Sequence, residues 1–326
     1  MTTSLYIINK PLRKIPAFSA LAASLVLAGC GSGPETKTYY TEQDLGKALF
    51  FDPILSRDST VSCASCHKPD YAFADNATVS TGVKGRKGGR NAPGVMNLAN
   101  HNFYFWDGRA ETLEQQALGP IENPVEMDLP VSVAVRRLKH SPVYNPSFVQ
   151  VYGKAPSQEL LGTAIAAYEN SLETSGTAFD RYMNGKDTTA MSASALRGLD
   201  IFNNKGRCFD CHFGSDFNGS DKFKNIGLYN GKDLNDPGRS AISGNPKDAG
   251  AFKTPGLRNI AKTAPYMHNG MFKTLREVID YYDQPDKFVP NAINRDTILR
   301  KPLGLTETEK KDLEAFLSAL SDTEEK

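Results

Sequence analysis

Hydrophobic residues recur at helical spacing in several stretches of this chain, and long polar connections separate these stretches. That spacing is typical of amphipathic helices with one apolar face. We predict helices after the capping residue Thr41, over 160–172, over 194–202, and after the capping box formed by Thr306 and Glu309. No segment alternates apolar and polar residues as a half-buried strand would. The pattern therefore predicts a mainly α protein.

The first segment of the chain, 1–29, has a different pattern. Lys10, Arg13 and Lys14 precede an uncharged apolar run that ends just before Cys30. This arrangement is typical of a signal peptide. Its end resembles the lipobox of bacterial lipoproteins, which implies cleavage before Cys30 and a lipid on that sulfur. An ordinary secretory signal with an unmodified cysteine is the alternative. We therefore expect a periplasmic protein, held at a membrane by its lipid.

The remaining chain divides into a tether and two domains. Segment 30–40 is rich in Gly, Ser, Pro and Thr, which is typical of a flexible tether. The composition turns polar again near 185–190, so we place one domain at 41–187 and a second at 188–326.

The net charge of the chain is small. Cleavage of segment 1–29 removes three basic residues and no acidic ones, which changes the formal net charge from +1 to −2. Nothing in this balance indicates binding to nucleic acid.

Two segments share the spacing Cys-x-x-Cys-His. They contain Cys63, Cys66 and His67, and Cys208, Cys211 and His212. In this spacing two thiols can add to the vinyl groups of one haem, and the histidine becomes a ligand of its iron. Zinc sites do not require a histidine directly after each cysteine pair. The chain has five cysteines, so two haems and one lipid leave none for a disulfide. We expect two covalently bound haem c groups in two cytochrome c-like domains packed against each other.

Other motifs surround these two. They are Arg-Asn-Ala-Pro at 90–93, Phe-Trp-Asp-Gly-Arg at 105–109, Gly-Pro to Val-Glu-Met at 119–127, and Phe-Lys-Thr-Pro to Asn-Gly at 252–270. In the order and spacing of these motifs the chain resembles the bacterial di-haem cytochrome c peroxidases and the related MauG enzymes, over nearly its whole mature length. The resemblance implies that peroxide reacts at the N-terminal haem, while the C-terminal haem stores or relays electrons.

The resemblance also implies catalytic roles. Trp106 is the only tryptophan in the chain, and it matches the residue that the family places between the two haems. An indole in that position can mediate electron transfer. A plain core aromatic is the alternative. Glu126 matches the distal carboxylate that moves a proton between the peroxide oxygens, and Gln116 and Pro120 match residues of the same pocket. A solvated surface glutamate is the alternative for Glu126. A shift of one residue would exchange Gln116 for Gln115.

Two positions depart from the classical peroxidases. Those enzymes carry a histidine that blocks the first haem in the oxidised state, and Val83 stands in its place here, so we expect an open first haem. On the far side of the second haem, classical members use a methionine and MauG-like members a tyrosine. That position falls on Tyr282, which helical spacing turns inward while Tyr281 points elsewhere. A plain core tyrosine would show the same pattern, and Met267 and Met271 are rival ligands.

A calcium site between the domains is a further implication of the resemblance. Asn91, Thr263 and Pro265 match it, and oxygen ligands suit that ion. Asn and Pro are also ordinary turn formers, so a plain loop is the alternative. We expect His101 and His140 to be surface or core residues rather than metal ligands.

Three functions remain open. The leading one is reduction of hydrogen peroxide to water at the haem on His67, with electrons that pass through the haem on His212 from a small cytochrome c or cupredoxin. The second is a MauG-like enzyme that uses peroxide to oxidise or modify a partner protein. An open first haem and Tyr282 as a ligand favour it, but Gly206 stands where MauG carries a surface tryptophan. Electron transfer with a protein surface would then need tyrosines such as Tyr104, Tyr229 or Tyr281. The third is a non-catalytic di-haem electron carrier.

Overall fold

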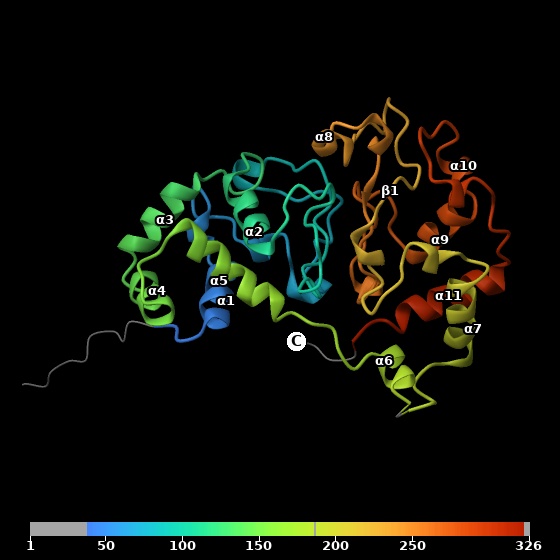
Figure 1. Cartoon of the computed structure of the whole chain (residues 1–326), viewed down its shortest axis with the longest axis horizontal. Coiled ribbons are helices and arrows are strands. Elements are labelled where there is room, and N and C mark those ends of the chain that lie inside the picture. The colour runs from blue at the N-terminus through green and yellow to red at the C-terminus, as the bar shows by residue number, and fades with distance from the viewer. Residues whose placement is uncertain (1–37, 186, 323–326) are drawn as a thin grey trace, which may run out of the picture. The chain divides into compact units, whose positions relative to one another are not determined.

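The computed structural model describes residues 38–185 and 187–322, and helices dominate this part of the chain (Figure 1). The first half contains α1 (Glu42–Phe51), α2 (Leu113–Glu122), α3 (Val131–His140), α4 (Tyr144–Tyr152) and α5 (Gln158–Asn170). The second half contains α6 (Ala178–Met183), α7 (Ala193–Asn203), α8 (Ser240–Ser243), α9 (Leu275–Asp283), α10 (Pro285–Phe288) and α11 (Glu307–Ser318). The strands β1 (Phe223–Lys224) and β2 (Phe252–Lys253) form one short antiparallel pair. The predicted mainly α fold is confirmed.

A first lobe is built around the packing of α1 on α5, and its core lies within residues 39–172. Thr41 caps α1 as predicted, because its hydroxyl accepts a hydrogen bond from the Asp44 amide. The two helices approach closely at Gly46, where an added Cβ would lie 1.8 Å from the Ala164 carbonyl oxygen. The predicted helix over 160–172 begins at Gln158 and ends at Asn170.

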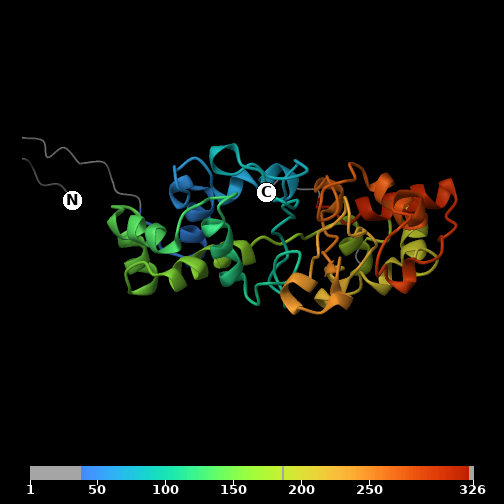
Figure 2. The ribbon, with the colours of Figure 1, turned by 90° about the horizontal axis from the view of Figure 1, so that it is seen from above.

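A second lobe has its own core within residues 178–320. Its centre is the packing of α7 against α11, where Phe202 and Phe316 meet edge to face at 5.0 Å. Gly198 permits this approach, since a Cβ there would lie 1.9 Å from the Asp312 carbonyl oxygen. The predicted capping box of Thr306 and Glu309 begins α11. Figure 2 shows the segment between α5 and α6 running from one lobe to the other.

The predicted domain boundary between 187 and 188 lies within the second lobe. Phe179 and Tyr182 of α6 already pack against the second core, while the first core ends with Leu172. The boundary itself stays a prediction. The predicted signal peptide, Cys30 and most of the tether lie outside the described residues. None of the helices within the described residues is long and apolar enough to cross a bilayer.

Candidate functional site

A cavity of about 740 Å³ is lined by residues of both lobes, and both Cys-x-x-Cys-His motifs open onto it. Each motif begins with a 3₁₀ turn, Cys63–Ser65 and Cys208–Asp210. In each turn the histidine amide donates to the carbonyl oxygen of the first cysteine, at 2.9 Å for His67 and 2.8 Å for His212. This local hydrogen bond holds two sulfurs and one imidazole together at the cavity wall. All four cysteines are free thiols.

Backbone carbonyl groups fix the orientation of both imidazoles. His67 Nδ1 lies 3.1 Å from the carbonyl oxygens of Phe73 and Pro93, and His212 Nδ1 lies 2.8 Å from that of Phe217. A carbonyl oxygen only accepts, so Nδ1 carries the proton and Nε2 keeps a lone pair for a metal. Burial lowers the pKa of both histidines, which favours this neutral form.

These residues fit haem c. Paired free thiols can form the thioether bonds, a neutral imidazole can bind iron, and the rest of the cavity wall is largely apolar. Two buried side-chain oxygens at the wall, Gln116 Oε1 and Glu169 Oε2, have no hydrogen-bond partner in the protein. Buried polar atoms of this kind need a partner from whatever fills the cavity.

Glu126, which the resemblance made the candidate distal carboxylate, lies in the cavity wall. Its amide donates to the Asn123 carbonyl oxygen, and Asn123 Nδ2 donates in turn to Glu126 Oε1 at 2.9 Å. Burial raises the pKa of Glu126, against the opposing effects of the Arg109 charge and the Asn123 hydrogen bond. The Glu126 carbonyl oxygen accepts from the Val83 amide at 2.8 Å. The buried side chain of Val83 packs in the first core and does not line the cavity.

The register of α2 separates the two neighbouring glutamines. Gln116 and Pro120 line the cavity one turn apart, whereas Gln115 is exposed. The Oε1 atom of Gln115 accepts from the Glu111 amide at the start of the helix. The structure thus brings Gln116, Pro120 and Glu126 to one cavity and leaves Gln115 outside it.

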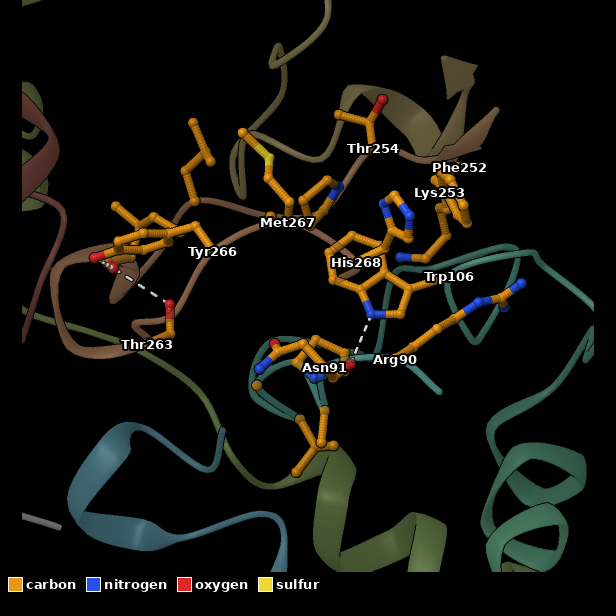
Figure 3. A pocket seen from close by; sticks show the side chains of 18 of the residues that line it. Arg90, Asn91, Trp106, Phe252, Lys253, Thr254, Thr263, Tyr266, Met267 and His268 are labelled. Carbon is orange, nitrogen blue, oxygen red and sulfur yellow. Dashed lines mark hydrogen bonds between the residues drawn. The ribbon is translucent and has the colours of Figure 1, made fainter. Parts of the chain in front are cut away.

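Trp106 is held between segments of both lobes (Figure 3). Its indole Nε1–H donates to the Asn91 carbonyl oxygen at 2.9 Å, and its own carbonyl oxygen accepts from the Lys253 amide at 2.8 Å. The ring also meets the edge of His268, at 6.5 Å between centroids. Because both ends of the residue are bonded, the indole has a fixed position beside the cavity, and its role as an electron relay stays a prediction.

Arg90 is an ion-pair centre that the sequence did not reveal. Its guanidinium donates to both carboxylate oxygens of Asp236, at 2.7 and 2.8 Å, and to Asp107 at 2.6 Å. Asp236 lies in the irregular segment between β1 and β2. Arg90 also lies over the Phe252 ring at 5.4 Å, in the region that Figure 3 shows. The partners of Arg90 are far apart in sequence, so no local pattern could have indicated them.

His268, for which the sequence gave no role, packs beside Arg90 and Trp106. Its ring stacks on Phe252 at 3.8 Å between centroids, and only 4% of the residue is exposed. Burial lowers the pKa of His268 to about 4, although the nearby Asp236 charge raises it, and the Arg90 charge lowers it further. His268 is therefore neutral at physiological pH and packs as an aromatic ring.

The second lobe presents one face of α9 to the cavity, as predicted. Leu275, Val278, Ile279 and Tyr282 line it. Burial raises the pKa of the Tyr282 phenol. Tyr281 points into the core of the second lobe, where it is fully buried and its hydroxyl donates to the Ile226 carbonyl oxygen at 2.6 Å. Of the two rival methionines, Met267 lines the cavity and Met271 does not.

The three residues predicted to bind calcium, Asn91, Thr263 and Pro265, also line the cavity. Asn91 Nδ2 donates to the Ala77 carbonyl oxygen at 3.0 Å, and the Thr263 hydroxyl donates to the Ile260 carbonyl oxygen at 3.2 Å. Both side chains therefore keep oxygen lone pairs, and the calcium site stays a prediction.

The two histidines expected not to be ligands lie in different surroundings. His140 is exposed at the end of α3. His101 lines the cavity, and its Nδ1 lies 3.0 Å from Lys253 Nζ.

Comparisons with known proteins agree with this geometry. Residues 41–188 match the family model for di-haem cytochrome c peroxidase. The methylamine utilization protein MauG of Methylorubrum extorquens is 39% identical over 281 residues, which cover 85% of this chain and 77% of MauG. Cytochrome c551 peroxidase of Nitrosomonas europaea is 39% identical over 240 residues, 73% of this chain and 71% of that protein. The crystal structure of a MauG-like protein associated with microbial copper homeostasis superposes with a TM-score of 0.78 at 31% identity, and the match covers 88% of this chain and 91% of that one.

The chain belongs to the di-haem cytochrome c peroxidase family. It is therefore an oxidoreductase of the peroxidase type, and membership of the family implies two haem c groups. The assignment of individual residues to the two haems stays a prediction.

The ion pairs of Arg90 generate a prediction about stability. Replacing Arg90 by Gln leaves Asp236 without its charged partner and the buried Asp107 with Arg109 alone, so unfolding of the holoprotein should cost about 1–3 kcal/mol less. The loss is smaller than for a fully buried pair because the Arg90 side chain is 22% exposed and Arg109 also contacts Asp107. Guanidinium unfolding measures it. The matched control is Arg57→Gln, whose partner Asp128 keeps Arg86. Equal losses of unfolding free energy in the two variants would contradict the role of Arg90 as an ion-pair centre.

Proposed function

We propose that this protein reduces hydrogen peroxide to water, with electrons from a small periplasmic cytochrome c or cupredoxin. The observation that carries the proposal is the buried carboxyl group of Glu126 in the cavity that Cys63, Cys66 and His67 line. We assign the first haem to these three residues and the second to Cys208, Cys211 and His212. When bound, the first haem supplies an iron at which peroxide can bind and accept electrons.

The reaction H₂O₂ + 2 e⁻ + 2 H⁺ → 2 H₂O requires proton movement between the two peroxide oxygens. A carboxylate can take the proton from one oxygen and return it to the other, first as base and then as acid. Glu126 Oε1 accepts from Asn123, which leaves Oε2 for this transfer. Burial raises the pKa of Glu126 from its ordinary value of 4.5, which makes the carboxylate a better base.

Gln116 and Pro120 complete the first-haem side of the cavity. Gln116 Oε1 is buried without a partner, so it can accept a hydrogen bond from peroxide or from a bound water. Such a bond would orient the oxygen that Glu126 protonates. Pro120 has no N–H, so it adds wall to the pocket without a competing donor.

Electrons would reach this site from the second haem through Trp106. The hydrogen bonds of Trp106 to Asn91 and Lys253 support this role, since they hold the indole rigidly between the lobes. We also propose that the phenol of Tyr282 would supply an oxygen ligand to the iron of the second haem. Its phenol lies in an apolar wall that raises its pKa, so its anion would require a bound cation.

A MauG-like reaction on a partner protein is the second candidate. The 39% identity to MauG and the position of Tyr282 favour it. Against it, Gly206 carries no side chain, and a Cβ there would lie 2.8 Å from the Ile201 carbonyl oxygen, so a tryptophan at this position would require the backbone to shift. Tyr104 and Tyr281 are buried and cannot end an electron path at the surface, which leaves the half-buried Tyr229. A non-catalytic carrier would have no use for the buried Glu126 and Gln116.

Three further assignments belong to this proposal. Export to the periplasm and lipidation of Cys30 follow from the sequence of the first thirty residues. A calcium ion held by Asn91, Thr263 and Pro265 would lie near the contact of Asn91 with Trp106. It would then stiffen the segment that positions the indole.

Replacing Glu126 by Gln tests the acid-base role. The amide keeps the shape of the side chain and cannot accept the proton, so kcat for peroxide should fall about 10²–10⁴-fold. In the unchanged protein kcat/KM should rise as the pH passes the raised pKa of Glu126, because the ionised carboxylate is the base. In the variant kcat/KM should no longer rise over this pH range. Turnover is measured with reduced cytochrome c as donor. Glu114→Gln, on the exposed side of α2, is the control. Unchanged turnover in Glu126→Gln would remove the proposed step.

The axial ligand of the second haem can be tested without turnover. Tyr282→Phe should change the low-spin EPR signal of the oxidised protein, because the ligand oxygen is lost. The matched control is its neighbour, since Tyr281→Phe loses only the hydrogen bond to Ile226 and should leave the signal unchanged. If Tyr282→Phe also leaves the signal unchanged, Met267 becomes the ligand to test.

A further inference from the structure

Glu169 is a buried acid for which the proposed reaction has no role. It lies on α5, only 3% of it is exposed, and it forms part of the wall of the cavity. Its Oε2 atom is buried without any hydrogen-bond partner in the protein. It is close enough to the Cys63 sulfur for its charge to raise the pKa of that thiol, as the charge of Glu126 also does. Glu169 therefore lies on the first-haem side of the cavity.

The surroundings of Glu169 disfavour its ionised form. Burial alone raises its pKa to about 8, and no charged side chain of α1, α2 or α3, the helices packed against α5, contributes to the shift. The titratable groups that respond to its charge are the Cys63 thiol and the Tyr168 phenol. An unpaired carboxylate in an apolar wall is costly, so a change of charge nearby should change its protonation.

We propose that Glu169 is a redox-linked proton acceptor of the first haem, which takes up one proton when an electron arrives there. The proposal rests on the proposed function in one respect, since it takes the first haem to occupy the cavity beside Cys63. An added electron brings negative charge next to the carboxylate, and binding of a proton cancels that charge. The proton comes from solvent, and the electron comes from the donor through the second haem.

This coupling would serve peroxide reduction, because that reaction consumes both electrons and protons. Each peroxide requires two electrons and two protons, and Glu126 returns to its starting form after it has moved one proton between the oxygens. After Glu126 has moved its proton, the first peroxide oxygen leaves as water, and the remaining oxygen needs two electrons and two protons to leave as the second water. Glu169 would pass one of these protons to it through a bound water, while the other comes from solvent. The Glu169 carboxylate left by this transfer would take up a new proton from solvent when the next electron arrives.

Potentiometry of the first haem tests the proposal without peroxide. Spectra of the holoprotein at fixed potentials, repeated from pH 6 to 10, give the reduction potential at each pH. Above pH about 8 the wild-type potential should fall with the slope of one proton per electron, because reduction then requires protonation of Glu169. In Glu169→Gln this slope should disappear. A slope that survives in Glu169→Gln would overturn the proposal.

Two variants separate this result from other causes. Glu169→Asp keeps a carboxyl group and should restore the slope, whereas loss of the slope in both variants would mean a structural effect and would overturn the proposal. Glu126→Gln should keep the slope even though it loses peroxide turnover, so failure of the proposed function and failure of this inference give different results. If Glu169→Gln does not fold, infrared spectra of the wild type should still show a protonated carboxyl band that vanishes above pH about 8 and is unchanged in Glu126→Gln. Absence of that band would contradict the proposal.

Discussion

Each Cys-x-x-Cys-His turn brings two thiols and one imidazole to a single cavity, and the rest of the site depends on this local constraint. In each 3₁₀ turn the histidine amide donates to the carbonyl oxygen of the first cysteine, which keeps the backbone of the three residues together at the cavity wall. Backbone carbonyl groups then hold Nδ1 of each imidazole and leave Nε2 for a metal. Both turns supply the same chemistry, so the two halves of the cavity differ only through the residues that face them.

Those facing residues differ between the two lobes. On the first-lobe side, Glu126, Gln116 and Glu169 bring two carboxyl groups and one amide into a largely apolar wall. On the second-lobe side, α9 brings aliphatic side chains and the phenol of Tyr282. Charged side chains such as Lys224 and Asp296 line the second-lobe side as well. What distinguishes the first-lobe side is its buried oxygen atoms without a hydrogen-bond partner, together with the carboxyl group of Glu126, whose pKa is raised by burial.

The sequence predicted the features that depend on neighbouring residues. The caps of α1 and α11, the extent of α7 and the cavity face of α9 all follow from spacing of a few residues. The sequence left Gln115 as an alternative to Gln116, and only the register of α2 in the structure places Gln116 in the cavity wall. Contacts between distant segments were not predictable in this way. The bond between Arg90 and Asp236 joins residues 146 positions apart, and the missing partner of Glu169 is visible only once α5 has packed.

Tyr281 and Glu169 both show that spacing along a helix does not predict how deeply a residue is buried. Spacing along α9 correctly turned Tyr281 away from the cavity, but its complete burial depends on the packing of the second core. Spacing along α5 would mark Glu169 as one polar residue beside a buried face, although it is itself buried. In both cases the spacing predicts the face of the helix on which the residue lies, and only the tertiary structure shows what surrounds its side chain.

The most direct test of this account is the mass of the purified, exported protein and of its proteolytic peptides. The account predicts two covalently attached haems, one on the peptide with Cys63 and Cys66 and one on the peptide with Cys208 and Cys211. A protein with a single haem, or with none, would contradict it.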